Sequence, residues 1–248
     1  MYVATVQKKV GDGGQNYVNL LADLDDINPE TARRLNKIER AGEDVTPLVR
    51  AYKNGDIDGN DLRRASKLLD NTNKEYISSG DITINELLDI ADKNDLDDVH
   101  VVVKDTDGDV RPLLQGRYNP DDTTKDSGWV YIKGRHIHGE QMDDPKKGAT
   151  DFFPMGQEIK GRNLEPANEM KKKDIKRMAY QAVKNSDTDR QDRITYDLGP
   201  KLESRTGVSK IRVVIRNGHI RQVYPKTGDA VHKWIQQLGK WEDELESN

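Results

Sequence analysis

The sequence contains no cysteine among its 248 residues. Disulfide bonds, thiolate metal sites and a cysteine nucleophile are therefore excluded. No apolar run approaches the roughly 18 residues that a membrane-spanning helix needs. The N-terminus also lacks the apolar core of a secretory signal. We expect a soluble protein without a membrane span. The missing signal does not exclude export, because a segment delivered by a secretion machine would lack a signal too.

Histidine is also scarce, with five in the chain, yet two of them lie two residues apart at His136 and His138. They follow an apolar stretch, residues 129–132, that we interpret as a β-strand running into both histidines. Residues i and i+2 of a strand point to the same face, so the two imidazoles could form an acid–base pair. The alternative is that one is a surface residue and the other packs in the strand.

Charge is distributed unevenly along the chain. Residues 127–248 hold 23 Lys and Arg against 18 Asp and Glu, whereas residues 1–126 hold 17 against 26. Four of the C-terminal acids lie in the last seven residues, so residues 242–248 form an acidic tail on a basic region. The basic region favours a polyanionic partner, although charge asymmetry between domains is also common without one.

The first 126 residues are predicted to form a mostly helical, acidic region that serves in delivery or docking. Helices are expected at residues 29–41, 58–69 and 81–91, and a strand at residues 99–103 precedes a turn at residues 105–109. Polar residues 119–128 indicate a linker. Asn54 to Gly59 begins like a calcium-binding loop, but its twelfth position is Ala65, where a bidentate glutamate is required. We therefore expect no metal site.

Residues 127–241 are predicted to be α+β, with a helix packed on an antiparallel sheet that has a basic outer face. The helix covers residues 171–184, one strand covers 194–198, and a hairpin at 210–224 turns at Asn217-Gly218. A regular hairpin pairs Arg216 with His219 and Ile211 with Tyr224. Gln222 and Tyr224 then share a face with aliphatic residues, so Gln222 is either a satisfied core amide or the edge of a site.

Two further segments carry candidate residues. Lys146 and Lys147 precede a glycine and are either a phosphate-binding pair or a solvated turn. Residues 151–154 (DFFP) hold both phenylalanines of the chain. We interpret them as a core anchor rather than as a platform for stacked bases.

Four segments in this order resemble the bacterial EndoU ribonuclease domain of polymorphic and contact-dependent toxins, within the barnase/EndoU/RelE-like superfamily. They are RHIHGE (135–140), GATDFFPMG (148–156), DIKRMAYQAVKN (174–185) and VSKIRVVIRNGHIRQVYP (208–225). The resemblance covers roughly residues 127–228. It implies an EndoU/barnase-like fold and metal-independent RNA cleavage, in which the 2′-oxygen attacks the adjacent phosphorus and leaves a 2′,3′-cyclic phosphate.

The resemblance also assigns roles to residues. His136 matches the family's first catalytic histidine and Tyr224 its closing tyrosine, while Gln222 stands where the family has Thr or Ser. The second family histidine has no counterpart, so either His138 substitutes for it or Lys146 or Lys147 acts as a cationic stabiliser. The residues expected to bind substrate are Lys146, Lys147, Thr150, Arg221 and Lys226. No cofactor is implied.

The leading hypothesis is thus an endoribonuclease toxin, delivered or secreted into the cytoplasm of a target cell and neutralised by an immunity protein. The oligomeric state stays open. One alternative is a non-catalytic module that binds RNA or protein through the basic sheet. Another is a phage or virion component that carries this domain.

Overall fold

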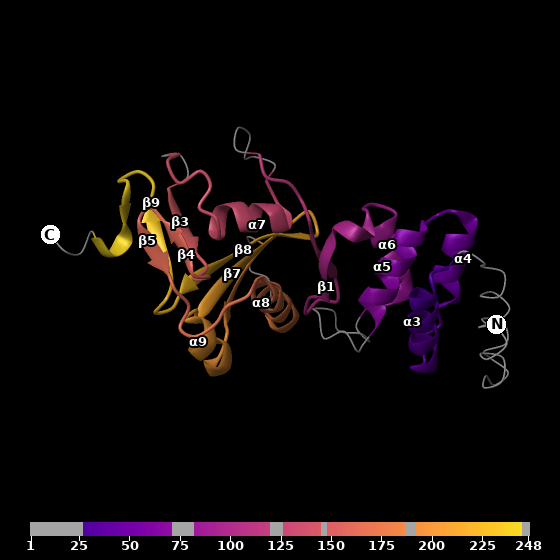
Figure 1. Ribbon diagram of the computed structural model, residues 1–248. Helices are drawn as coiled ribbons and strands as arrows, with labels where there is room; N and C mark the ends of the chain where they lie inside the picture. The colour runs from indigo at the N-terminus through magenta and orange to yellow at the C-terminus, as the bar shows by residue number, and fades with distance from the viewer. Residues whose placement is uncertain (1–26, 71–81, 120–125, 145–147, 187–191, 245–248) are drawn as a thin grey trace. The chain divides into compact units, whose positions relative to one another are not determined.

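The computed structural model describes residues 27–70, 82–119, 126–144, 148–186 and 192–244. The chain divides into two compact units between Val99 and His100 (Figure 1). This division lies earlier than the boundary expected at residue 126, because the strand Val110–Leu114 packs on the C-terminal sheet. Most of the expected linker lies outside the described residues, but Ser127 pairs with Arg117 in an isolated β-bridge.

The first unit is helical in its described part, as the sequence predicts. It contains α3 (Pro29–Arg40), α4 (Thr46–Asn54), α5 (Gly59–Leu69), α6 (Ile84–Ala91) and the 3-10 turn η2 (Leu96–Asp98). Asn28 caps α3 by accepting from the N–H of Glu30. Asp58, one of the two acids in the calcium-like segment, instead caps α5. The core is built from leucines of all four helices, including Leu35, Leu48, Leu62 and Leu87.

The second unit combines helices with small antiparallel sheets, so it is α+β as predicted. Its elements are β1 (Val99–Lys104), β2 (Val110–Leu114), α7 (Gly128–His136), β3 (Ala149–Phe152), β4 (Gln157–Ile159), β5 (Arg162–Leu164), α8 (Lys172–Asn185), β6 (Arg193–Asp197), α9 (Pro200–Thr206), β7 (Lys210–Arg216), β8 (His219–Thr227), β9 (His232–Ile235), β10 (Lys240–Trp241) and the 3-10 turn η5 (Glu242–Glu244). The strand orders are β6-β7-β8, β10-β9-β3, β4-β5 and β1-β2.

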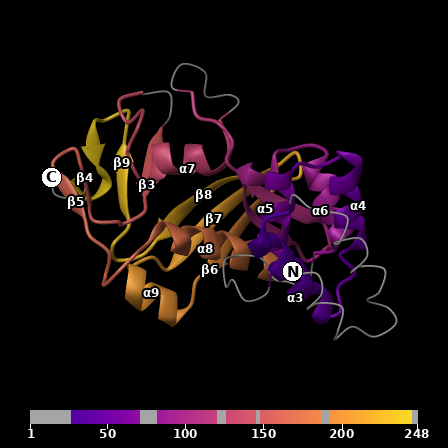
Figure 2. The ribbon, with the colours of Figure 1, turned by 45° about the vertical axis from the view of Figure 1, so that its right-hand side comes forward.

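Two helices lie on opposite faces of the β6-β7-β8 sheet (Figures 1 and 2). Helix α8 packs on β6 and β7 with the apolar stripe that its sequence predicts, including Ile175 and Met178. Helix α7 packs on β8. The sheet therefore separates an apolar side under α8 from a more polar side under α7.

The prediction of a strand at residues 129–132 is wrong, because these residues lie within helix α7. Most residues of α7 are buried, Trp129 and Ile132 among them. A short helix buried on nearly all sides has no amphipathic period, so its apolar run cannot be told from a buried strand. His136 is the last residue of this helix, and His138 lies beyond it and is exposed. The two histidines therefore do not share a strand face.

The predicted hairpin forms, but its register differs from the regular pairing after Ile220. Arg216 pairs with His219 and Ile215 with Ile220, as expected. A β-bulge then shifts the ladder, so that Gln222 pairs with Val214 and Tyr224 with Arg212. One extra residue in a strand moves the side chains that follow to the opposite face. The prediction that Gln222 and Tyr224 share a face with the aliphatic residues is therefore wrong, and both lie on the α7 side.

The described part of the acidic tail packs against the rest of the second unit. Asp243 and Glu244 form ion pairs with Arg162, and Glu242 pairs with Lys233. Arg162 also lies over the ring of Trp241, with its guanidinium carbon 4.8 Å from the ring centroid. Pairs at such exposed positions contribute about 0–1 kcal/mol each, so the packing of Trp241 matters more here than the charges.

Gly128 starts α7 where its backbone passes close to the end of β2. Its φ of +77° lies in the left-handed region, and an added Cβ would lie 2.6 Å from the carbonyl oxygen of Leu114. We expect Gly128→Ala to lower the free energy of unfolding by about 2–4 kcal/mol, because backbone strain and a backbone clash combine. Urea unfolding measures this loss.

Gly161 is the matched control for this prediction. It has a similar φ of +74°, but no atom lies within 4 Å of its added Cβ. Gly161→Ala should therefore cost only the strain, about 1 kcal/mol. Equal losses in the two variants would show that the contact between Gly128 and β2 is not tight.

Candidate active site

His136 is held at the end of α7 by the backbone of β3. Its side chain is buried, with the whole residue 2% exposed. Nδ1 lies 2.7 Å from the carbonyl oxygen of Asp151, and the His136 carbonyl accepts from the N–H of Phe153. Because a carbonyl oxygen only accepts, Nδ1 carries the ring proton. Nε2 is then left with a lone pair.

Gln222 and Tyr224 complete a cluster around this imidazole. The side-chain nitrogen of Gln222 lies 2.8 Å from Nε2 of His136, so the amide donates to the lone pair. The ring of Tyr224 stacks on the imidazole, with centroids 5.3 Å apart and planes 15° apart. Tyr131 meets the same ring edge-on at 6.2 Å. Three of the residues expected to be catalytic thus lie together, brought there by α7 and by the bulge in β8.

Burial determines the charge of this histidine. The pKa of His136 is lowered to about 3, chiefly by desolvation and also by the neighbouring Arg135, while the hydrogen bond to the Asp151 carbonyl opposes the shift. At neutral pH the imidazole is therefore uncharged, with its tautomer fixed. A neutral imidazole is the form that a general base needs, and the Nε2 lone pair of His136 accepts from the Gln222 amide.

Asp151, whose backbone carbonyl holds His136, also carries a buried carboxyl group. Its Oδ1 is buried and accepts no hydrogen bond within the described part of the chain. Burial raises the pKa of Asp151, and the nearby Lys226 and Lys233 oppose this effect. The Nζ of Lys226 also lies 5.9 Å from the ring centroid of Tyr224. Lys226 therefore places a cation beside the His136 cluster.

Sequence reasoning did not single out Asp151 or Tyr131. Asp151 is a lone acid in an apolar segment, and that signal could have marked it as a buried charge. Tyr131 was not considered, because residues 129–132 were predicted to form a strand and instead belong to α7. Burial raises its pKa, so its phenol stays protonated at neutral pH.

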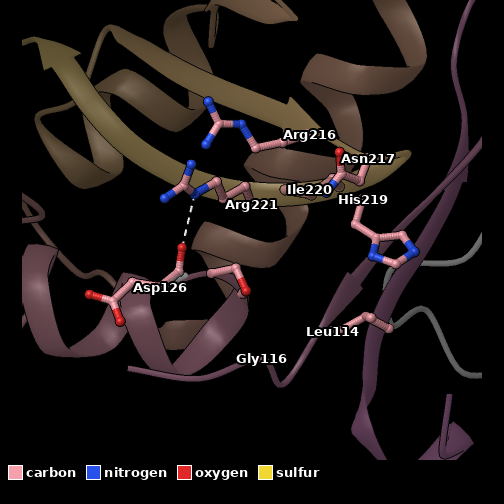
Figure 3. A pocket seen from close by; sticks show the side chains of 10 residues that line it. Leu114, Gly116, Asp126, Arg216, Asn217, His219, Ile220 and Arg221 are labelled. Carbon is pink, nitrogen blue, oxygen red and sulfur yellow. Dashed lines mark hydrogen bonds between the residues drawn. The ribbon is translucent and has the colours of Figure 1, made fainter. Parts of the chain in front are cut away.

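The other sequence-predicted residues lie apart from the His136 cluster or outside the described residues. His138 is exposed beyond α7. Thr150 is 2% exposed, and its hydroxyl accepts from the amide of Gln236. Lys146 and Lys147 lie outside the described residues. Arg221 donates from Nε to the carbonyl oxygen of Asp126, 2.9 Å away, at the edge of a separate pocket (Figure 3).

Compared with protein-family models, curated proteins and solved structures, the chain matches none. Within the described residues, no group of three or more histidine and carboxylate side chains is placed to hold a metal ion. No helix among those residues has the length and apolar character to cross a membrane.

Proposed function

We propose that the second unit is a metal-independent endoribonuclease of the EndoU/barnase-like type. The observation that carries this proposal is the neutral imidazole of His136, whose Nδ1–H is held by a backbone carbonyl and whose Nε2 meets Gln222 beside Tyr224. Such an arrangement suits removal of a proton from a hydroxyl group without a metal ion. The α+β architecture and the helix–sheet packing support the proposal.

In the proposed reaction, the substrate 2′-hydroxyl takes the place of the Gln222 amide at Nε2 of His136. The imidazole accepts its proton as the 2′-oxygen forms a bond to the adjacent phosphorus. The bond from phosphorus to the 5′-oxygen breaks, and Tyr224 donates a proton to that leaving oxygen. Lys226, over the ring of Tyr224, supplies positive charge for the phosphoryl oxygens. The products are a 2′,3′-cyclic phosphate and a 5′-hydroxyl.

A second candidate function is RNA binding without cleavage. The burial of His136 favours this function, because the residue is 2% exposed and its Nε2 already accepts a hydrogen bond. Gln222 is only half-buried and belongs to a strand at the edge of its sheet, so its amide can be displaced by a substrate hydroxyl. The endoribonuclease proposal requires this displacement, and the binding alternative does not.

The wild-type protein is expected to cleave a uridine-containing oligoribonucleotide in the presence of EDTA. The fragments should carry 2′,3′-cyclic phosphates, because the attacking oxygen belongs to the substrate. Denaturing gels and mass spectrometry of the fragments measure this. The matching oligodeoxyribonucleotide is the control, since it lacks the nucleophile. Intact RNA with a salt-sensitive shift in a native gel would instead support the binding module.

The biological setting proposed with this activity is that of a toxin acting in the cytoplasm of a target cell. A specific immunity protein would neutralise it. Residues 127–241, which hold the proposed site, carry 23 Lys and Arg against 14 Asp and Glu. An acidic surface on the partner would therefore be electrostatically complementary to this region.

A further inference from the structure

A pocket of about 330 Å³ lies between the β7–β8 turn and the start of α7 (Figure 3). The hairpin contributes its polar residues Arg216, Asn217, His219 and Arg221. The other lining residues are Leu114, Gly116, Asp126, Ser127, Gly128 and Ile220. The volume is at the lower end of the range typical of small-ligand sites, about 300–1,000 Å³.

The lining is cationic on balance. Asp126 is the one carboxylate among the lining residues, and it is 0% exposed, with Oδ1 accepting from the N–H of Asn119. Its backbone oxygen accepts from Nε of Arg221, which fixes the direction of that guanidinium. Arg216 is exposed, and its guanidinium extends to the same side of the hairpin as that of Arg221 (Figure 3). Two arginines that line one pocket favour a phosphate, which the donor geometry of their guanidinium groups matches.

Helix α7 and strand β8 each contribute residues to both the pocket and the His136 cluster. Gly128 lines the pocket and starts α7, and His136 ends it. At a rise of about 1.5 Å per residue, the two ends of this helix are about 12 Å apart. On β8, Arg221 lines the pocket and the next residue, Gln222, bonds to His136. A short stretch of nucleic acid along β8 would therefore reach both places.

We propose that this pocket binds a phosphate of the RNA strand at a position removed from the bond that is cleaved. The choice of an RNA strand rests on the proposed function, whereas phosphate as the recognised group follows from the arginines. Arg216 and Arg221 hold the phosphate oxygens. The pocket thereby sets which phosphate of the strand lies at His136.

The test uses the full chain in EDTA and a fluorescein-labelled tetramer of deoxyuridylate. This probe carries phosphates but no 2′-hydroxyl, so binding is measured apart from cleavage. Arg216→Ala should weaken binding about tenfold, the usual effect of losing a charged hydrogen bond. It should also reduce the slope of log affinity against log salt by about 0.7, the value for one phosphate contact on a single strand. Fluorescence anisotropy across a salt series measures both.

Arg177→Ala is the matched control, since it removes an exposed arginine from α8, on the opposite face of the sheet. Its affinity and salt slope should stay near those of the wild type. Equal losses in both variants would mean that net charge alone binds the strand, and the proposal would be overturned. Arg216→Lys, which keeps the charge without the fork of donors, should recover only part of the affinity. Thermal melting establishes that the variants are folded.

Competition with uridine 5′-monophosphate separates a strand phosphate from a free nucleotide. The proposal expects the mononucleotide to bind much more weakly than the tetramer. Equal affinities, both sensitive to Arg216→Ala, would make the pocket a nucleotide site and overturn the proposal. Cleavage of RNA together with an unchanged affinity of Arg216→Ala would overturn the pocket alone. Binding as expected without RNA cleavage would overturn the endoribonuclease proposal and leave the phosphate site in place.

Discussion

His136→Gln is expected to slow RNA cleavage in EDTA by about 10²- to 10⁴-fold, the usual contribution of a general base. The physical reason is that the neutral Nε2 of His136 is the group that accepts the 2′-hydroxyl proton in the proposed reaction. The amide of glutamine can still donate to the Asp151 carbonyl, which holds Nδ1 in the native protein. The glutamine side chain has no basic nitrogen to replace Nε2. Initial rates on a uridine-containing oligoribonucleotide measure the effect.

His138→Gln decides between the two roles that the sequence leaves open for the second histidine. His138 is exposed and lies beyond α7, apart from the ring contacts and hydrogen bonds of His136. If His138 is only a neighbour, the variant should cleave RNA at a rate within about twofold of the wild type, because typical surface substitutions change little. A loss as large as that of His136→Gln would show that His138 replaces the missing family histidine. Unchanged cleavage by a folded His136→Gln protein would contradict the site assignment itself.

The second large effect is expected in the stability of the protein towards acid. The pKa of His136 falls from 6.5 to about 3 in the native state, chiefly because the imidazole is buried. Between these two values the unfolded chain binds a proton that the native state does not. The contribution of the neutral His136 to the free energy of unfolding is thus complete above about pH 6.5 and is lost as the pH falls towards 3. One proton per molecule corresponds to about 1.4 kcal/mol per pH unit, so about 2 kcal/mol is lost by pH 5.

Urea unfolding at pH 7 and pH 5 measures this loss, and His136→Gln is the control. The raised pKa of Asp151 acts in the opposite direction, because its native carboxyl holds a proton that the unfolded chain releases above about pH 3.8. Both proteins share that effect, so the difference between their pH dependences isolates His136. The wild type should lose about 2 kcal/mol more than the variant. Parallel losses in the two proteins would mean that the native imidazole takes up its proton as readily as the unfolded one.

Local patterns predicted the regular elements well. The stripe of α8, the Asn28 cap of α3 and the Asn217-Gly218 turn all involve residues close in sequence, whose spacing and capping chemistry are visible in the chain. Helix α7 was missed because burial on nearly all sides leaves no period. Residues of α4, including Leu48, form a helix that the sequence analysis did not assign.

The sequence by itself determined the α+β class of the second unit, the exclusion of thiol chemistry and the choice of His136, Gln222 and Tyr224 as candidate residues. Only the tertiary structure decided that these three meet and that His138 stands apart. The physical reason is the β-bulge at Arg221, where one extra residue turns Gln222 and Tyr224 towards α7. Helix α7 and strand β2, which pack on β8, come from residues distant in the sequence, so the face that Gln222 and Tyr224 meet is not visible in the hairpin alone. The neutral state of His136 likewise follows from its burial, and no local pattern encodes that.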